Sequence, residues 1–433
     1  MQIKQTTKRL VSQAFVRHAA TLVSGNVAGQ IIALAAYLLL CRMYSPEDFG
    51  LFHLFLSVGG FLAFFTTCSF QYAIVLPRND RMGAACAQIC LAGNLGAALL
   101  CLAAVCTIGP LLTEATHTAV LNPLLPLLPL YMLACGLWAT LNYWFIRHKQ
   151  FQGIARYQIG VSLGTSAAKL GWGSRSIPGG LVFGTLAGQY AALLAVAWRR
   201  RALLAPLLHW QALRIRVCLR KYSKFLYFTF PKDLVNYLGG NLPSLLLAPW
   251  FPLAELGFFG MAVTLAMRPV NLLVNAVYQS LYQQCIELYH QRGSMRFLGR
   301  LLLRGFLIAT PCFAALYFLM PHLVRFLLGE GWGQTAVYLQ LILPWILFTL
   351  LFNPFDYLPD IFGRQGTLLG FEVLQTVLRT AALLTGIRHE SFALATALYS
   401  ATSCLVILLR AGWYFHLVHT YEKSITHDPH PAE

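Results

Sequence analysis

Apolar residues form long runs along the chain, and short polar segments separate these runs. A helix that crosses a bilayer needs about 20 mostly apolar residues, and about twelve such runs follow one another with short loops between them. We expect transmembrane helices at residues 18–41, 50–76, 84–111, 120–146, 153–173, 177–198, 225–250, 256–285, 301–327, 335–362, 366–386 and 391–415. The pattern predicts an all-α integral membrane protein.

The composition supports this prediction and excludes several classes of protein. The 433 residues are 58% hydrophobic and 11% charged, whereas soluble domains carry about 25% charged residues. No loop is long enough to bury a core of its own, so a separate catalytic or nucleotide-binding domain is excluded. The 11 cysteines occur without a Cys-x-x-Cys motif and the histidines without a cluster. We therefore expect no disulfide, no metal site and no bound cofactor.

The basic residues indicate the orientation of the helices. The chain has 32 lysines and arginines against 15 acidic residues. With the N-terminus inside the cell, 24 of the bases lie in cytoplasmic segments and four lie on the opposite side. Cytoplasmic loops of membrane proteins carry an excess of this kind. We expect both termini in the cytoplasm, and we attribute the net charge of +17 to topology rather than to a nucleic-acid partner.

An internal repeat divides the chain. Residues 44–52 align with residues 251–259 at an offset of 207, so that Asp48 matches Glu255. Both segments follow an odd-numbered span, carry an acidic residue just outside the membrane and lead into the next span. A second match, at an offset of 215, pairs the Leu-Pro at 128–129 with a Leu-Pro later in the chain. We infer that the second half repeats the first.

This repeat predicts two lobes of six helices each. We expect the lobes at residues 1–200 and 225–417, joined by a basic cytoplasmic linker at 201–224 and followed by a tail at 418–433. Each copy has an even number of spans, so both copies have the same orientation, which is the parallel-repeat geometry of some transporters. A substrate cavity is expected between the lobes.

Three short motifs resemble those of a known family. They are Arg42–Leu51 (RMYSPEDFGL) after the first span, Ala73–Pro77 (AIVLP) at the end of the second, and Gly329–Trp332 (GEGW) before the tenth. Together with the topology and the repeat, they make the chain similar to the polysaccharide exporters, which include the O-antigen translocases and related oligosaccharide flippases. These proteins share the multidrug/oligosaccharidyl-lipid/polysaccharide (MOP) exporter superfamily with multidrug and toxin extruders (MATE) and lipid II flippases.

The resemblance implies a MATE-like fold and a transport function rather than an enzymatic one. A protein of this family would flip an undecaprenyl-diphosphate-linked oligosaccharide, such as an O-antigen or another surface polysaccharide repeat unit, from the cytoplasmic to the periplasmic leaflet by alternating access. The implied location is the bacterial inner membrane. The implied partners are the lipid-linked glycan, the bilayer lipids and other polysaccharide assembly proteins.

Polar residues within the spans are candidates for the substrate site, because a charge at mid-bilayer costs about 2.5 to 3.5 kcal/mol and normally faces a cavity or a partner. In the expected eighth span they recur every three or four positions and so share one helical face: Thr264, Arg268, Asn271, Asn275, Gln279 and Tyr282. The guanidinium of Arg268 can hold a diphosphate, and the amides of Asn271 and Asn275 suit sugar hydroxyls. Alternatively, Arg268 pairs with a structural carboxylate and the amides join helices.

Three other spans add candidates for the cavity wall. Lys232 and Asp233 are adjacent in the seventh span, where a preceding proline predicts a kink. Asn26 and Gln30 lie four residues apart in the first span, and Lys169 continues a milder polar face in the fifth. We expect Lys232, Lys169, Asn26 and Gln30 to face substrate. A purely structural Lys232–Asp233 pair is the alternative.

Two further acids are candidates for ion coupling. Asp356 and Glu372 lie eight residues before and after Arg364, so they are expected at similar depth on neighbouring helices. Two facing carboxylates repel, and one of them would bind a proton. Together with Asp233, they are the candidates for coupling to H⁺ or Na⁺. Alternatively, Arg379 or Arg364 forms a salt bridge with them.

Other functions make different predictions. A cation-coupled multidrug extruder of the same superfamily would have an acidic cavity, and four bases expected within the spans argue against it. A membrane-embedded glycan polymerase or ligase would present a long outer loop with catalytic bases, and the longest outer loop here has only about ten residues. A scaffold or a channel would not need the two-lobe repeat.

Overall fold

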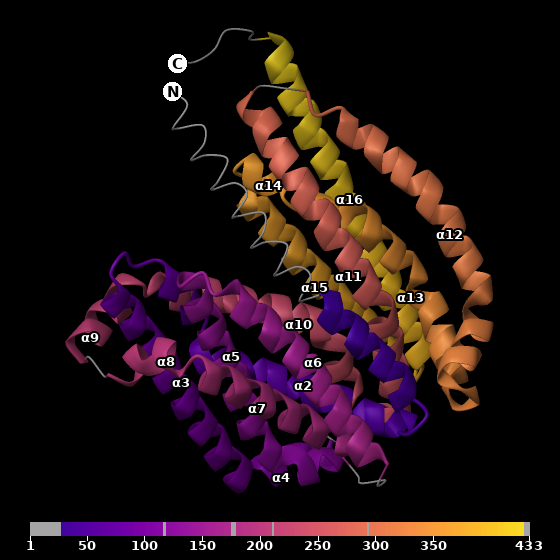
Figure 1. Ribbon diagram of the computed structural model, residues 1–433. Coiled ribbons are helices and arrows are strands. Elements are labelled where there is room, and N and C mark those ends of the chain that lie inside the picture. The colour runs from indigo at the N-terminus through magenta and orange to yellow at the C-terminus, as the bar shows by residue number, and fades with distance from the viewer. Residues whose placement is uncertain (1–26, 116–117, 175–178, 210–211, 292–293, 428–433) are drawn as a thin grey trace. The chain divides into compact units, whose positions relative to one another are not determined.

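The computed structural model describes residues 27–115, 118–174, 179–209, 212–291 and 294–427. These residues form helices and connecting turns, with no strand among them (Figure 1). The prediction of an all-α protein is confirmed. The chain forms two compact units, Met1–Pro249 and Trp250–Glu433, and each unit is described by itself.

The first unit contains seven long helices within the described residues. They are Val27–Leu40, α2 (Pro46–Thr67), α3 (Asp80–Thr107), α5 (Leu128–Arg147), α6 (Phe151–Gly173), α7 (Gly180–Arg199) and α10 (Phe230–Leu247). Shorter elements connect them: η1 (Phe70–Val75), α4 (Gly109–Ala115), η2 (Ala119–Leu127), α8 (Arg201–Leu208), α9 (Ala212–Lys221) and the π-helical turn η3 (Phe225–Thr229).

The second unit contains five long helices. They are α11 (Leu253–His290), α12 (Phe297–Leu328), α13 (Gly333–Phe352), α15 (Gln365–Arg388) and α16 (Phe392–His427), with the short elements η4 (Glu330–Trp332), η5 (Asn353–Phe355) and α14 (Leu358–Ile361) between them. The mostly buried α13 packs against α11, α12 and α16, and α15 packs on α16. In contrast, α12 runs along the edge of this unit and is mostly exposed (Figure 1).

Every predicted span coincides with a helix. Of the described residues, nine segments are long and apolar enough to cross a membrane. The helix Val27–Leu40 is apolar but shorter, while the charged α6 and α10 are not among the nine. The count of twelve spans and the orientation of the termini therefore remain predictions.

The two segments of the internal repeat both open a long helix, as expected. At the start of α2, Ser45 and Asp48 form a capping box: the Ser45 side chain accepts a hydrogen bond from the Asp48 N–H, and the Asp48 carboxylate accepts one from the Ser45 N–H. At the start of α11, the matching Glu255 instead accepts a hydrogen bond from the Tyr338 hydroxyl on α13. The repeated acid therefore fixes a helix start in both units, through different partners.

Glycines allow α6 and α7 to pack closely. Gly180, Gly184 and Gly188 recur every four residues on α7, so they lie on one face, and small residues at this spacing let helix backbones approach each other. A Cβ atom at Gly184 would lie 2.7 Å from the backbone nitrogen of Lys169 on α6. Next to this contact, the buried Tyr44 hydroxyl donates a 2.8 Å hydrogen bond to the Lys169 carbonyl.

We expect Gly188→Ala to destabilise the first unit by about 2 kcal/mol, because its Cβ would overlap the backbone of Thr165 and Gly164 and overpacking of this kind costs about 1 to 3 kcal/mol. The measurement is the thermal unfolding of the detergent-purified protein. Gly171→Ala on α6 is the matched control, since its Cβ would meet no atom within 4 Å. Equal melting temperatures for the two variants would contradict the expectation.

Prolines explain two departures from α-helical geometry. Pro231 has no N–H to give to the carbonyl four residues earlier, and the preceding turn widens to a π-helix in which the Phe230 N–H bonds to the Phe225 carbonyl. This π-helical turn is the departure from regular helix geometry that was expected near Lys232. Pro123 and Pro126 lie within η2, which is a 3₁₀-helix rather than the first part of α5.

The basic segment at residues 201–224, expected as a linker, is folded onto the first unit. It forms α8 and α9, and both helices pack against α3. The Gln88 side chain on α3 donates hydrogen bonds to the carbonyls of Leu207 and His209, and the Trp144 indole donates one to Leu203. The compact units divide at residues 249 and 250, one helix later than expected, because α10 packs against α2 and the Tyr237 hydroxyl donates to the Ser57 carbonyl.

Candidate functional site

The candidate site is the set of charged and polar side chains held within the long helices. In the first unit, Lys232 and Asp233 near the start of α10 form an ion pair, with 3.8 Å between Nζ and Oδ1. The Lys232 side chain is 61% exposed, whereas that of Asp233 is 17% exposed. The hydroxyl of Ser69 also donates a 2.9 Å hydrogen bond to Asp233. Asp233 is therefore anchored to the loop after α2, while the Lys232 ammonium remains accessible.

Lys169 is buried among aromatic rings rather than presented on an open surface. Its Nζ lies 4.4 Å from the centre of the Phe52 ring and 5.8 Å from that of Tyr37. Such cation–π contacts stabilise an ammonium group away from water. The residue is only 7% exposed, so a contact between Lys169 and substrate would require these helices to move.

The candidates on the first span are only partly described. Asn26 lies outside the described residues, and Gln30 is exposed. One residue before Gln30, a Cβ at Gly29 would lie 3.2 Å from the Gln158 carbonyl oxygen on α6. The helix Val27–Leu40 therefore packs closely against the polar face of α6 that was expected to line the cavity.

In the second unit, α11 presents the expected polar stripe. Arg268 is partly buried near the middle of this helix, and Asn271 and Asn275 are exposed. The spacing places these three side chains on one face. Exposed amides within a segment that is apolar enough to cross a membrane require a polar environment at membrane depth. The side chain of Gln279 lies outside the described set.

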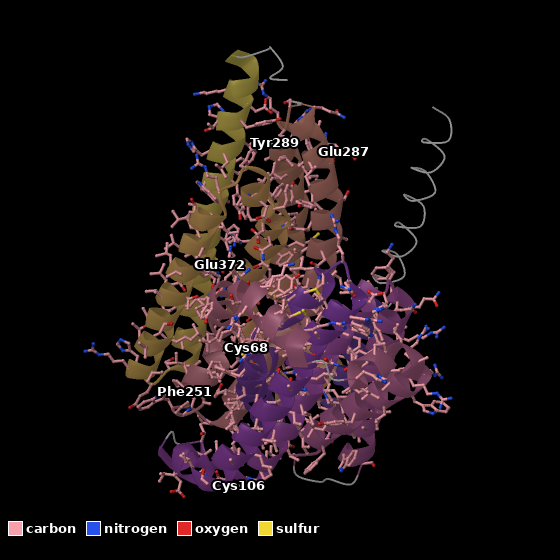
Figure 2. All side chains as sticks on the ribbon, turned by 90° about the vertical axis from the view of Figure 1, so that its left-hand side faces the viewer. Cys68, Cys106, Phe251, Glu287, Tyr289 and Glu372 are labelled. Carbon is pink, nitrogen blue, oxygen red and sulfur yellow. The ribbon has the colours of Figure 1, made fainter. Side chains whose placement is uncertain are left out.

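One arginine forms ion pairs with both acids of the second unit, and it is neither of the two arginines predicted as partners. Arg410 on α16 lies 3.3 Å from Asp356 and 3.2 Å from Glu372, atom to atom. Its Nη2 also donates to the Asn353 side chain, and the Tyr414 hydroxyl donates to Asp356. The two carboxylates are therefore close to each other, as expected for coupled acids. Figure 2 labels Glu372 on α15.

Among the described residues, neither Arg379 nor Arg364, the two arginines expected as partners, forms a salt bridge with these acids. Arg379 is buried, donates a 2.8 Å hydrogen bond to the Ser403 hydroxyl, and lies over the rings of Tyr399 and Trp345. Arg364 is exposed at the start of α15.

Arg410 was not predicted as a site residue. The helix α16 continues to His427, so Arg410 lies at its middle and is 6% exposed. One signal could have revealed this: no proline interrupts the sequence between Phe392 and His427, so the helix need not end at residue 415, where the last span was expected to end.

Comparisons with known proteins establish the family. A family model described as polysaccharide biosynthesis protein matches residues 39–337. The chain belongs to the polysaccharide biosynthesis protein family. A search of curated proteins found no match.

Several solved structures of transporters and of a flippase have a similar fold. A lipid II flippase, MurJ, in an inward closed conformation matches with a TM-score of 0.68 and 12% identity over 94% of this chain and 90% of that one. An inward-facing multidrug resistance MATE family transporter of the MOP superfamily matches with a TM-score of 0.66 and 13% identity over 91% and 96%. A Vibrio cholerae MATE transporter, VcmN, matches with a TM-score of 0.54 and 13% identity over 98% and 99%. The predicted MATE-like fold is confirmed.

The family match and the nine apolar helices of the described residues indicate a multi-pass membrane protein of the polysaccharide biosynthesis family, and its fold is similar to that of MOP superfamily transporters. The resemblance drawn from the three sequence motifs is thereby confirmed.

Proposed function

We propose that this protein flips an undecaprenyl-diphosphate-linked oligosaccharide from the cytoplasmic to the periplasmic leaflet of a bacterial inner membrane. Family membership supports a role in polysaccharide biosynthesis, and the fold is that of transporters and flippases. The observation that carries the proposal is the stripe on α11, where a partly buried guanidinium stands in line with two exposed amides.

The stripe suits a charged glycolipid. The guanidinium of Arg268 can hold two oxygens of a diphosphate at once, and Asn271 and Asn275 can both donate hydrogen bonds to sugar hydroxyls and accept them. Lys232, which is 61% exposed, would be a second cationic contact. The isoprenoid tail would remain in the bilayer while the polar part crosses by alternating access.

The membrane potential would assist export. Moving one elementary charge through a potential of 100 mV is worth about 2.3 kcal/mol. An inside-negative potential drives an anionic diphosphate outward, so export would not require a second energy source. We propose that Asp356, Glu372 and Asp233 bind H⁺ or Na⁺ when the empty carrier resets.

A multidrug extruder is the second candidate, because the similar structures include MATE transporters. The buried or partly buried bases Lys169, Arg268, Arg379 and Arg410 make its preferred cationic substrates a poor match. A cation would be repelled wherever these groups are within reach of the substrate.

The test measures how much of a fluorescent lipid-linked oligosaccharide reaches the outer leaflet of proteoliposomes. A fluorescent undecaprenyl-diphosphate oligosaccharide is placed in both leaflets, and dithionite then quenches the outer one. Protein-containing vesicles are expected to lose almost all fluorescence, while protein-free vesicles keep about half. If quenching stays near half and the same vesicles accumulate a cationic dye, the chain is an extruder and the proposal is wrong.

A further inference from the structure

The second unit contains a groove between α12 and α16 that none of the candidate residues above lines. The groove has a volume of about 280 Å³. Its walls include Leu298, Gly299 and Leu302 from α12 and Tyr414, Phe415 and Val418 from α16. We propose that this groove binds an anionic phospholipid of the surrounding bilayer, at a site separate from the substrate path.

The groove is polar at one end and apolar along its length. On α16 the lining extends from Ala411 to Lys423, which is about 18 Å at 1.5 Å per residue. His419, Glu422 and Lys423 lie at one end with Arg296, whereas Ala411 and Phe352 lie towards the other. A phospholipid has the same polarity along its length, a charged head group followed by an apolar chain.

The charge at the polar end favours an anion. Glu422 is 8% exposed, accepts hydrogen bonds from the Ser294 hydroxyl and the Met295 N–H, and lies 3.3 Å from the Arg296 Nε. Its carboxylate is therefore held by the α11–α12 connection and fixes Arg296 at the rim. Arg296 and Lys423 both line this end and are exposed, so it carries two basic side chains against one acidic side chain. Basic pockets between membrane helices on the cytoplasmic side bind anionic lipid head groups in this way.

The apolar part of the groove is accessible from the side of the unit. Phe415, which lines the groove, is 46% exposed, and α12 also exposes Leu301 and Leu303. Large apolar side chains at the surface of a membrane helix face lipid. The Tyr414 hydroxyl donates to Asp356, so its polar atom is already satisfied.

The chain offers a way to fill the groove without disturbing the fold. Gly299 lines it, and a Cβ atom added there would meet no other atom within 4 Å. Gly299→Phe should therefore place a ring where the acyl chain would lie. Gly370→Phe on α15 is the matched control, because Gly370 is exposed and its Cβ would also meet nothing within 4 Å.

The experiment is native mass spectrometry of the full-length protein in detergent, titrated with phosphatidylglycerol or phosphatidylcholine. We expect the wild type and Gly370→Phe to retain one phosphatidylglycerol and to gain thermal stability from it, and Gly299→Phe to lose both effects while melting like the wild type without lipid. Lys423→Gln should weaken binding about fivefold, the loss of one basic contact.

Several outcomes would overturn the proposal. Retention of the lipid by Gly299→Phe would place it elsewhere, and equal binding of phosphatidylcholine would remove the role of the charged rim. If inorganic phosphate alone displaces phosphatidylglycerol, the groove binds an anion rather than a phospholipid. Displacement by a trace of undecaprenyl phosphate would make it a substrate site. All these measurements report binding, so they are independent of whether the protein flips a glycolipid.

Discussion

Replacing Arg268 with alanine is expected to slow translocation of the lipid-linked oligosaccharide by at least tenfold. A hydrogen bond to a charged group contributes about 1.5 to 3 kcal/mol, which corresponds to a factor of about 10 to 150 in binding or rate. Arg268→Lys keeps the charge but loses the planar pair of donors that fits a diphosphate, so its rate should be intermediate. The measurement is dithionite quenching in proteoliposomes.

Arg304→Ala is the control, because Arg304 is an exposed arginine on the neighbouring helix α12. Protein level and melting temperature are compared for all variants. If Arg268→Ala translocates normally, the proposed diphosphate contact is wrong. If it instead loses more than about 2 kcal/mol of stability, the structural interpretation is favoured, in which the guanidinium joins helices and a lost partner is costly.

The positions of the helices could be predicted because the bilayer sets their length. An apolar run of about 20 residues has few alternatives in a membrane, and each predicted run coincides with a helix. The ends were harder to predict. The helix α11 extends to His290 and α16 to His427, since polar residues can continue a helix beyond the hydrocarbon region when neither proline nor a cap ends it.

The candidate site was predictable in part. A polar stripe such as that on α11 follows from helical periodicity alone, and Arg268, Asn271 and Asn275 lie on this one long helix; that they line a substrate cavity stays a prediction. Partners on other helices do not follow from periodicity. Ser69 binds Asp233 across 164 residues of sequence, and Lys169 lies against Phe52, because tertiary packing brings these groups together.

The segment at residues 201–224 was misread for a related reason. Its six basic residues suggest an exposed linker, but apolar residues are interspersed among them. Leu207 is 6% exposed and Cys218 is fully buried, so two short amphipathic helices lie against α3. The charge of this segment led to its prediction as a cytoplasmic linker, and it did not indicate whether the segment is folded.

Replacing Arg410 with alanine is expected to destabilise the second unit by about 3 kcal/mol. Its guanidinium is 7% exposed and serves Asp356 and Glu372 together. Removing one partner of a buried ion pair costs about 3 to 5 kcal/mol, because the remaining charge has no counterion. The lower figure applies here, since the two carboxylates are 30% and 39% exposed. For a unit of this size, the melting temperature should fall by about 6 to 12 °C.

A variant in which all three charges of this cluster are removed distinguishes the effect of a lost counterion from the effect of lost packing. Arg410→Met combined with Asp356→Asn and Glu372→Gln removes both orphaned charges and keeps much of the volume, so this triple variant should recover most of the stability lost by Arg410→Met alone. Arg388→Ala, at the exposed end of α15, should lose less than about 1 kcal/mol. A triple variant less stable than Arg410→Met would show that the hydrogen bond from the Tyr414 hydroxyl to the Asp356 carboxylate matters more than the two unpaired charges. Recovered stability without recovered translocation would show that one of the two acids is needed for transport itself.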